Sequence, residues 1–418
     1  MQAVAQQETT ITDSSNIMRL TLSYQWLAVA MLVVFSAIFH IAGIDEFPLS
    51  DSEAYRALSA WRSTMPNVTG DPLLADSPMV WWSQKIAFSL LGGSEFSSRI
   101  FTALAGILLS ISPLFFASLL GRSRAYITAI LLSISPVLLA SARMSSSTTW
   151  SLLLAIGMLW FVWRFYETGQ KRYGLSGLVA LAFVIFMTES QSPLLALILV
   201  GAVAIALMLT LYASFVEDSP NEVITQIRER VNSLSWIESL AITGLILFSI
   251  ATGFTLAWDG LKIVGESLAQ FLRGFTQSQY PEAYRPLDAL IFYEVWLIPF
   301  FFIGVGLIAY QQKITFIERF LMLWVGLGFI AFIVYPDITT SHAMWLVVPL
   351  SVMMAYVISQ AFVRVSPPID APVLVTDERG LLWGRFTVAL ITFVMFILLT
   401  AHLQFLSRGF LLLPNGTP

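Results

Sequence analysis

The chain has 418 residues, of which 57% are hydrophobic and 11% charged, and its mean hydropathy is +0.78. A soluble domain needs about a quarter of its residues charged to cover its surface, so this composition excludes a soluble globular protein. The lack of cysteine excludes disulfides, thiolate nucleophiles and cysteine-based metal sites. The net charge of −4 is too small to indicate a partner, and no basic tract suggests a nucleic-acid partner.

The apolar residues fall in long, continuous runs. A helix needs about 20 apolar residues to cross a hydrocarbon core of roughly 30 Å, and backbone polar groups in lipid must pair within the helix. The sequence therefore predicts an all-α, polytopic membrane protein with about eleven transmembrane helices. The predicted spans are residues 25–44, 98–120, 125–142, 149–166, 174–190, 194–215, 237–258, 288–310, 314–335, 343–363 and 384–405.

The distribution of Lys and Arg over the short loops predicts the orientation. Cytoplasmic loops carry an excess of these residues, and every second loop of this chain does so, whereas the intervening short loops hold Arg143 and almost nothing else. We therefore expect a cytoplasmic tail at residues 1–24, a transmembrane domain over residues 25–405 and an outer tail at residues 406–418. The expected location is the plasma membrane.

Three connections are too long to be simple turns. Two of them, residues 45–97 and 259–287, lie on the predicted outer side, and loops of this length in a compact protein are usually functional or disordered. The third, residues 217–236, lies inside and places Val223, Ile227, Val231 and Leu234 on one face. This spacing predicts an amphipathic helix that lies in the membrane interface.

The first outer loop opens with a predicted helix over Ser52–Arg62, and Asp51 and Glu53 stand at its start. Acidic residues there can cap the helix and complement its dipole, or they can act as a general base or bind a metal. A second amphipathic helix, Val80–Leu91, is too short to span, so we expect it to lie flat with Trp81 and its neighbour at the headgroups.

Five segments of the chain form an ordered pattern, and their order is more specific than any one of them. They are SDSEAYRALSAW, LGGSEFSSRI, SISPVLLASARMSS, QYPEAYRPLDALIFYE and HAMWLVVPL, which begin at Ser50, Leu91, Ser133, Gln279 and His342. This pattern resembles the GT-C glycosyltransferases that use polyprenyl-phosphate sugars, which include protein O-mannosyltransferases and aminoarabinose transferases. The last two segments resemble a bacterial and archaeal branch of mannosyltransferases. The resemblance extends from Leu20 to about Leu350.

The sequence departs from the family pattern at several charged positions. The Asp-Glu pair of the family becomes Ser52-Glu53, with Asp51 one position early, and the His of the proline turn becomes Asp76 or Ser77. An Arg-x-x-Arg-x-Asp segment becomes MSSSTTW, and a lysine becomes His342. These losses leave open an inactive relative that keeps only the apolar frame.

The resemblance implies a set of site residues. The catalytic candidates are Asp51 and Glu53, and the candidates for substrate binding are Asp45, Tyr55, Asp76, Arg99, Arg143, Arg285 and His342. For each there is a plainer interpretation: helix caps for the carboxylates, membrane anchors for the arginines, a solvated loop for Arg285 and a structural role for His342. Asp51 and Glu53 could also bind a divalent cation, Mg or Mn, although one acidic pair is weak support.

The expected function is transfer of a mannose-like sugar from a polyprenyl-phosphate donor to a protein or glycan acceptor on the outer face. The alternative is a non-catalytic GT-C-like subunit or scaffold of a membrane-protein complex, or an accessory of lipid-glycan transport. Either protein would contact membrane lipids. An ion-coupled transporter is disfavoured because the predicted spans are almost free of charge, with Glu189 and Glu294 at helix ends only.

Overall fold

The structure is a computed structural model that describes residues 26–65, 77–216, 221–252, 259–277, 286–311 and 314–362. All regular elements in these ranges are helices, which confirms the all-α prediction. After a first helix, Trp26–Ile41, they are α2 (Asp51–Arg62), α3 (Pro78–Leu91), α4 (Glu95–Ile111), η1 (Ser112–Phe116), α5 (Ala117–Leu120), α6 (Arg122–Ile134), α7 (Pro136–Arg143), α8 (Ser147–Thr168), α9 (Lys171–Phe183), η2 (Val184–Thr188), α10 (Ser192–Val216), α11 (Asn221–Ser233), α12 (Trp236–Ala251), α13 (Asp259–Arg273), α14 (Pro286–Tyr293), α15 (Leu297–Gln311), α16 (Phe316–Val334), η3 (Thr340–Ala343) and α17 (Met344–Phe362).

Six helices of the described residues are long and apolar enough to cross a membrane, and up to nine are if each bent pair counts as one span. The six are Glu95–Leu120, Ser147–Thr168, Lys171–Thr188, Ser192–Tyr212, Phe316–Val334 and Thr340–Gln360. The chain is thus a multi-pass membrane protein, but the predicted total of eleven is not confirmed. The first helix is shorter than a full span, and predicted span 384–405 lies outside the described residues.

Two of the predicted spans are each broken into two helices, and the residues at the two breaks contact each other. Helices α6 and α7 are bent by 58° at Ser135, because Pro136 has no N–H to continue the helix. Helices α14 and α15 are bent by 88° around Glu294. The Glu294 carboxylate accepts hydrogen bonds from the Ser135 hydroxyl and from the Val137 N–H at 3.4 Å. The two bends are therefore joined by a buried polar contact.

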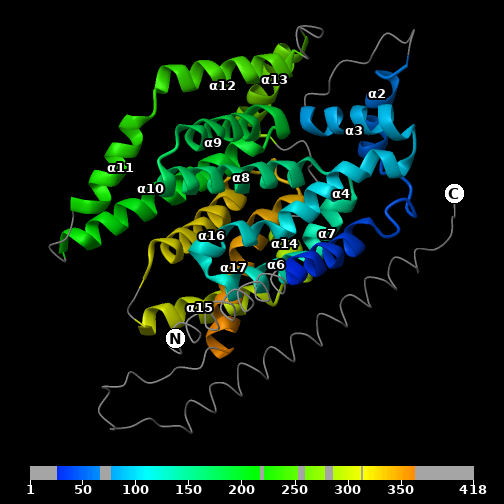
Figure 1. The fold of residues 1–418 in the computed structure, drawn as a ribbon. Helices are drawn as coiled ribbons and strands as arrows, with labels where there is room; N and C mark the ends of the chain where they lie inside the picture. The colour runs from blue at the N-terminus through cyan, green and yellow to red at the C-terminus, as the bar shows by residue number, and fades with distance from the viewer. Residues whose placement is uncertain are drawn as a thin grey trace, which may run out of the picture.

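Helix α17 forms the centre of the bundle and packs against α6, α15 and α16 (Figure 1). Its side chains are almost wholly enclosed, and Trp345 has no exposed surface. Close packing elsewhere depends on Gly106 of α4. A Cβ built at Gly106 would lie 2.4 Å from the Cβ of Ala142 and 2.7 Å from the Cδ2 of His40. Only glycine therefore lets α4 approach α7 and the first helix this closely.

Helices α2 and α3 lie at one end of the bundle, and α11 lies at the other (Figure 1). A small apolar cluster of Ala57, Ala60, Trp81, Phe88 and Ile263 joins α2, α3 and α13. Trp81 is only 4% exposed, and its Nε1 donates a hydrogen bond to the Ser59 hydroxyl at 3.1 Å. The expectation that Trp81 faces lipid headgroups is therefore wrong, because α3 packs against α2 and α4 and this packing encloses Trp81, while Ile86, Leu90 and Leu91 of α3 stay exposed.

The amphipathic helix predicted for residues 217–236 is present as α11, Asn221–Ser233. Its axis is bent by 57° from that of α12, which follows directly. A sharp change of direction between a polar helix and an apolar one is the geometry of a chain that turns from the membrane surface into the membrane.

Candidate functional site

Helix α2 begins at Asp51 and presents two carboxylates to different surroundings. Ser50 precedes the helix, and its backbone N–H and its hydroxyl each donate to Glu53 Oε2 at 3.0 Å. The Ser50 N–H contact is one half of a capping box; in the other half the Ser50 side chain faces the backbone N–H of Glu53, so backbone donors that the first turn leaves open are satisfied. Glu53 is 2% exposed, whereas Asp51 and Ser52 are exposed.

Glu53 forms a buried, two-pronged ion pair with Arg99 of α4. Arg99 Nε donates to Oε1 at 3.1 Å, and Nη2 donates to Oε2 at 2.9 Å. The same guanidinium donates to the carbonyls of Ile44, Phe47 and Pro48 at 2.9, 2.8 and 3.1 Å. These contacts occupy all five N–H donors of an arginine. Arg99 therefore fixes the loop and α2 onto α4, and we call this arrangement the Glu53–Arg99 clamp.

The surroundings of Glu53 determine its charge. Burial raises the pKa of this carboxyl, but the hydrogen bonds and positive charge of Arg99, together with Ser50, outweigh it and hold the pKa below its ordinary value of 4.5. Glu53 is therefore ionised at neutral pH, and all the contacts of its oxygens stabilise the ionised form. Such a carboxylate holds structure well and is a poor proton acceptor.

Arg143 ends α7 and reaches the last turn of the first helix. It donates to the carbonyls of Phe39, Ala42 and Gly43 at 3.4, 2.8 and 2.9 Å. A cation at this position complements the negative end of a helix dipole. These contacts use three of its five N–H donors, and the side chain is half-buried. Arg143 thus differs from Arg99, whose donors are all used.

A second buried carboxylate, Glu189, lies between η2 and α10. Its Oε2 accepts from the hydroxyls of Ser147 and Thr148 at 2.8 and 3.1 Å, and its Oε1 accepts from the Ser151 hydroxyl at 2.9 Å. His342 Nε2 lies 3.5 Å from Oε1. Sequence reasoning placed Glu189 only at a helix end. The signal it missed was the hydroxyl-rich segment after Arg143, which replaces the charges of the family pattern.

The imidazole of His342 is held in one orientation. Its Nδ1 accepts from the Thr339 N–H at 3.0 Å, so in the neutral ring Nε2 carries the proton and points toward Glu189. Burial raises the pKa of Glu189, but the positive charge that His342 carries when protonated, together with the Ser147 and Ser151 hydroxyls, lowers it below the ordinary value. Trp345 packs edge-on against His342 with centroids 4.7 Å apart.

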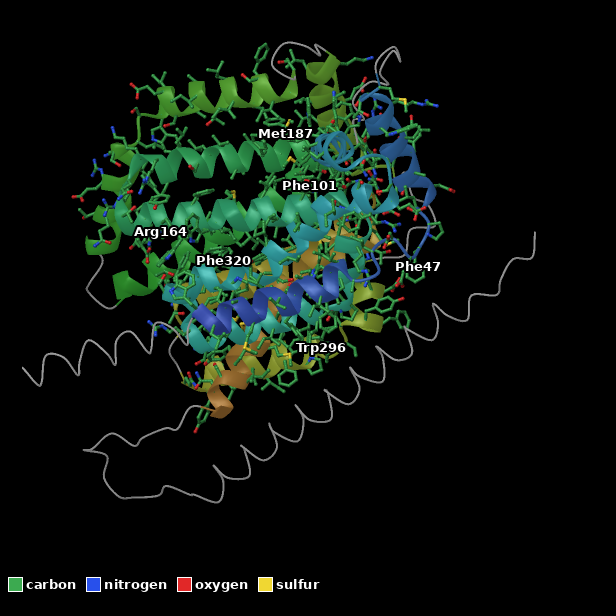
Figure 2. The ribbon with its side chains drawn as sticks, turned by 45° about the vertical axis from the view of Figure 1, so that its right-hand side comes forward. Phe47, Phe101, Arg164, Met187, Trp296 and Phe320 are labelled. Atoms are coloured by element: carbon green, nitrogen blue, oxygen red, sulfur yellow. The ribbon has the colours of Figure 1, made fainter. Side chains whose placement is uncertain are left out.

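The remaining predicted residues are placed as follows. Asp45 and Tyr55 are exposed with Asp51 on the outside of the loop, and Tyr55 is 66% exposed. Asp76 and Arg285 lie outside the described residues. Figure 2 shows Phe47, which binds Arg99 through its carbonyl, at the edge of the molecule where this loop lies. The site thus consists of two parts: the buried Glu53–Arg99 clamp, which is structural, and an exposed acidic surface that includes Asp45 and Asp51.

The described residues contain no group of three or more His, Asp or Glu side chains that could hold a metal ion. In the Asp51-Ser52-Glu53 segment, both oxygens of Glu53 already accept from Arg99. The guanidinium also places a positive charge where a cation would bind, so this segment does not fit a divalent cation.

The fold and this loop define a multi-pass membrane protein whose first long loop folds onto the bundle. Residues 75–216, about a third of the chain, match a family model described as dolichyl-phosphate-mannose-protein mannosyltransferase. The fold is similar to that of ArnT from Cupriavidus metallidurans in the apo state, with 14% identity, a TM-score of 0.54, and coverage of 82% of this chain and 63% of that one. The fold is also similar to that of ArnT from the same organism bound to undecaprenyl phosphate, with 14% identity, a TM-score of 0.55, and coverage of 81% of this chain and 63% of that one.

Both findings agree with the resemblance seen in the sequence: residues 75–216 are similar to a mannosyltransferase family, and the fold is similar to that of ArnT. The chain spans 63% of the length of each of these ArnT structures. No curated protein sequence matches the chain.

Proposed function

We propose that this protein is a membrane glycosyltransferase that moves a sugar from a polyprenyl-phosphate donor to an acceptor hydroxyl on the outer face. The observation that carries the proposal is the Glu53–Arg99 clamp, because it fixes the helix that presents Asp51. The description of the matched family and the fold shared with ArnT, one structure of which holds undecaprenyl phosphate, support the donor class.

In the proposed reaction Asp51 accepts the proton of the acceptor hydroxyl. The acceptor oxygen forms a bond to the anomeric carbon of the sugar, and the bond from that carbon to the phosphate oxygen breaks. The electron pair leaves with polyprenyl phosphate, and the guanidinium group of Arg143 stabilises the negative charge of the departing phosphate. The proposal assigns no step to a divalent cation.

The proposed roles divide the predicted residues by their surroundings. Arg143 holds a phosphate oxygen through the two N–H donors that its carbonyl contacts do not use. Asp45 and Tyr55 contact the sugar or acceptor, since both are exposed and Tyr55 lies one turn of α2 after Asp51. Glu53 and Arg99 act as positioning residues. Asp76 and Arg285 complete the proposed substrate contacts, whereas His342, 2% exposed and facing Glu189, is proposed to position that carboxylate. The proposed acceptor is a protein or a glycan.

The test is donor turnover by the full chain in proteoliposomes, with polyprenyl-phosphate mannose as the probe and a membrane extract as the acceptor source. The wild type is expected to release polyprenyl phosphate, and Asp51→Asn to reduce the rate at least about 100-fold, the scale of a lost general base. Glu46→Gln, an exposed carboxylate of the same loop, should stay within twofold. Turnover by Asp51→Asn at the wild-type rate would reject the assignment of the base.

A second candidate is a non-catalytic GT-C-like subunit of a larger membrane complex. One observation favours it: the hydrogen-bonding groups of Glu53 and Arg99 are occupied by each other and by the backbone, so neither is open to a substrate. Such a subunit copurifies with partner proteins, carries no prenyl phosphate and gives no donor turnover. Lack of turnover by the wild type, with intact fold and stable partners, would establish this alternative.

A further inference from the structure

Cationic side chains gather at the end of the bundle opposite α2, where α8, α9 and α11 meet. Residues 164–172 and 225–233 hold five cations and two acidic residues: Arg164, Lys171, Arg172, Arg228, Arg230, Glu167 and Glu229. Figure 2 shows Arg164 at the far end of the helices from Phe47. This cationic end is therefore well separated from the candidate active site.

Two contacts hold α11 against the other helices of the cationic end. The Tyr166 hydroxyl donates to Gln226 Oε1 at 3.3 Å. Arg230 lies so close over Gly169 that a Cβ there would be 1.9 Å from its Nη1. The guanidinium of Arg230 therefore adds its charge to the turn between α8 and α9.

Arg164 and Arg172 both lie near the ring of Tyr173, with their Cζ atoms 5.6 and 5.0 Å from its centroid. Arg164 also pairs with Glu167 at 2.8 Å, but both side chains are partly exposed, and such surface pairs are weak. Both guanidinium groups therefore lie against the same aromatic ring, and their charge is incompletely neutralised.

An apolar groove begins about one helical turn beyond Arg172. It has a volume of about 380 Å³ and is lined by Leu154, Phe161, Leu175, Val179, Phe183 and Ile246 of α8, α9 and α12. This volume lies in the range of ligand pockets, about 300–1,000 Å³. The groove runs from the cationic end into the apolar part of the bundle.

Helices α11 and α12, which lie beside the groove, indicate the level of the lipid headgroups. Helix α11 is polar and amphipathic, and its axis turns by 57° into the apolar α12 at Trp236. Trp236 is 45% exposed, and exposed tryptophan is enriched where headgroups meet hydrocarbon. The cations thus stand at headgroup level, with the groove below them in the hydrocarbon.

We propose that this groove is a binding site for a membrane phospholipid with an anionic headgroup. Its phosphate is bound by Arg164 and Arg172, and one of its acyl chains lies along Leu175, Val179 and Phe183. Guanidinium groups match phosphate oxygens through paired N–H donors, so an anionic headgroup is favoured over a zwitterionic one. The site is independent of the proposed transfer reaction.

The headgroup part is tested by native mass spectrometry of the full chain in neutral detergent, titrated with phosphatidylglycerol or with phosphatidylcholine of the same acyl chains. We expect the first phosphatidylglycerol to bind more tightly, and Arg164→Gln and Arg172→Gln each to weaken it about fivefold. Arg122→Gln, a charge change at an exposed position of α6, should leave the Kd within twofold. Equal affinities for the two lipids, or equal losses in all three variants, would overturn the proposal.

The groove part is tested by filling it. Val179→Phe is expected to raise the Kd of both lipids at least fivefold, because the phenyl ring occupies the path of the acyl chain whatever the headgroup. Val200→Phe adds the same ring at an exposed position of α10, 49% exposed, and should change neither Kd. Unchanged binding by a folded Val179→Phe variant would show that the acyl chain lies elsewhere.

Discussion

The two sides of helix α2 carry carboxylates of the same charge with opposite environments. On the inner side Glu53 is enclosed and held by Arg99, and on the outer side Asp51 is exposed. Burial with a permanent cation makes a carboxylate a structural anchor, whereas an exposed one beside a rigid helix start can accept a proton. Proximity in sequence therefore does not make the two residues one functional unit.

The largest effect is expected when the inner side loses its cation. Arg99→Ala leaves the Glu53 charge buried and unpaired, which should lower the free energy of unfolding by about 3–5 kcal/mol. Denaturant unfolding in detergent measures this loss, and Arg122→Ala at an exposed position of α6 is the control, expected to change the free energy of unfolding by about 0.5 kcal/mol or less. A loss of less than 1 kcal/mol in Arg99→Ala would show that the clamp does not hold the loop.

The acid dependence of stability should come from the buried carboxylates. The folded-state pKa values of Glu53 and Glu189 lie below the ordinary value of 4.5. Their stabilisation is therefore fully present above about pH 4.5 and is lost as the pH falls through the folded-state values. Unfolding of the wild type and of the double variant Glu53→Leu/Arg99→Leu, followed from pH 7 downward, should give a shallower acid loss in the variant. Parallel curves would contradict this.

The buried Glu189 offers a milder comparison with Glu53. Glu189→Gln keeps the size but replaces an acceptor oxygen with an NH₂ group, so one hydroxyl donor or His342 loses its partner. We expect a loss of about 1–3 kcal/mol in unfolding free energy. Glu238→Gln, an exposed residue in the first turn of α12, is the matched control and should change it by less than about 0.5 kcal/mol. Equal losses would mean that the hydroxyls around Glu189 do not stabilise its charge.

The sequence predicted the parts of this fold that depend on local patterns. Runs of apolar residues located the long helices, and the spacing of Ile227 and Val231 predicted α11. Predicted span 125–142 is broken in the structure before Pro136, and this proline is a local signal of the break that the sequence itself contains.

The parts that could not be predicted depend on contacts between distant segments. Arg99 and Glu53 are 46 residues apart. By residue type and position in the sequence, each was as suitable for contacting substrate as for a structural ion pair. Only the folded chain shows that they satisfy each other. The hydroxyl-rich segment after Arg143 was visible in the sequence, but its pairing with Glu189 was not: the partners of Glu189 come from α8 and from His342, and no spacing within its own segment points to them.

The most direct test measures turnover and stability together for Asp51→Asn and Glu53→Gln. We predict that Asp51→Asn loses at least about 100-fold in donor turnover while its free energy of unfolding stays within about 0.5 kcal/mol of the wild type. Glu53→Gln should instead lose about 1–3 kcal/mol of unfolding free energy, with turnover per folded molecule close to that of the wild type. Normal turnover in Asp51→Asn, with abolished turnover in a fully folded Glu53→Gln, would contradict the division of α2 into a structural and a chemical side.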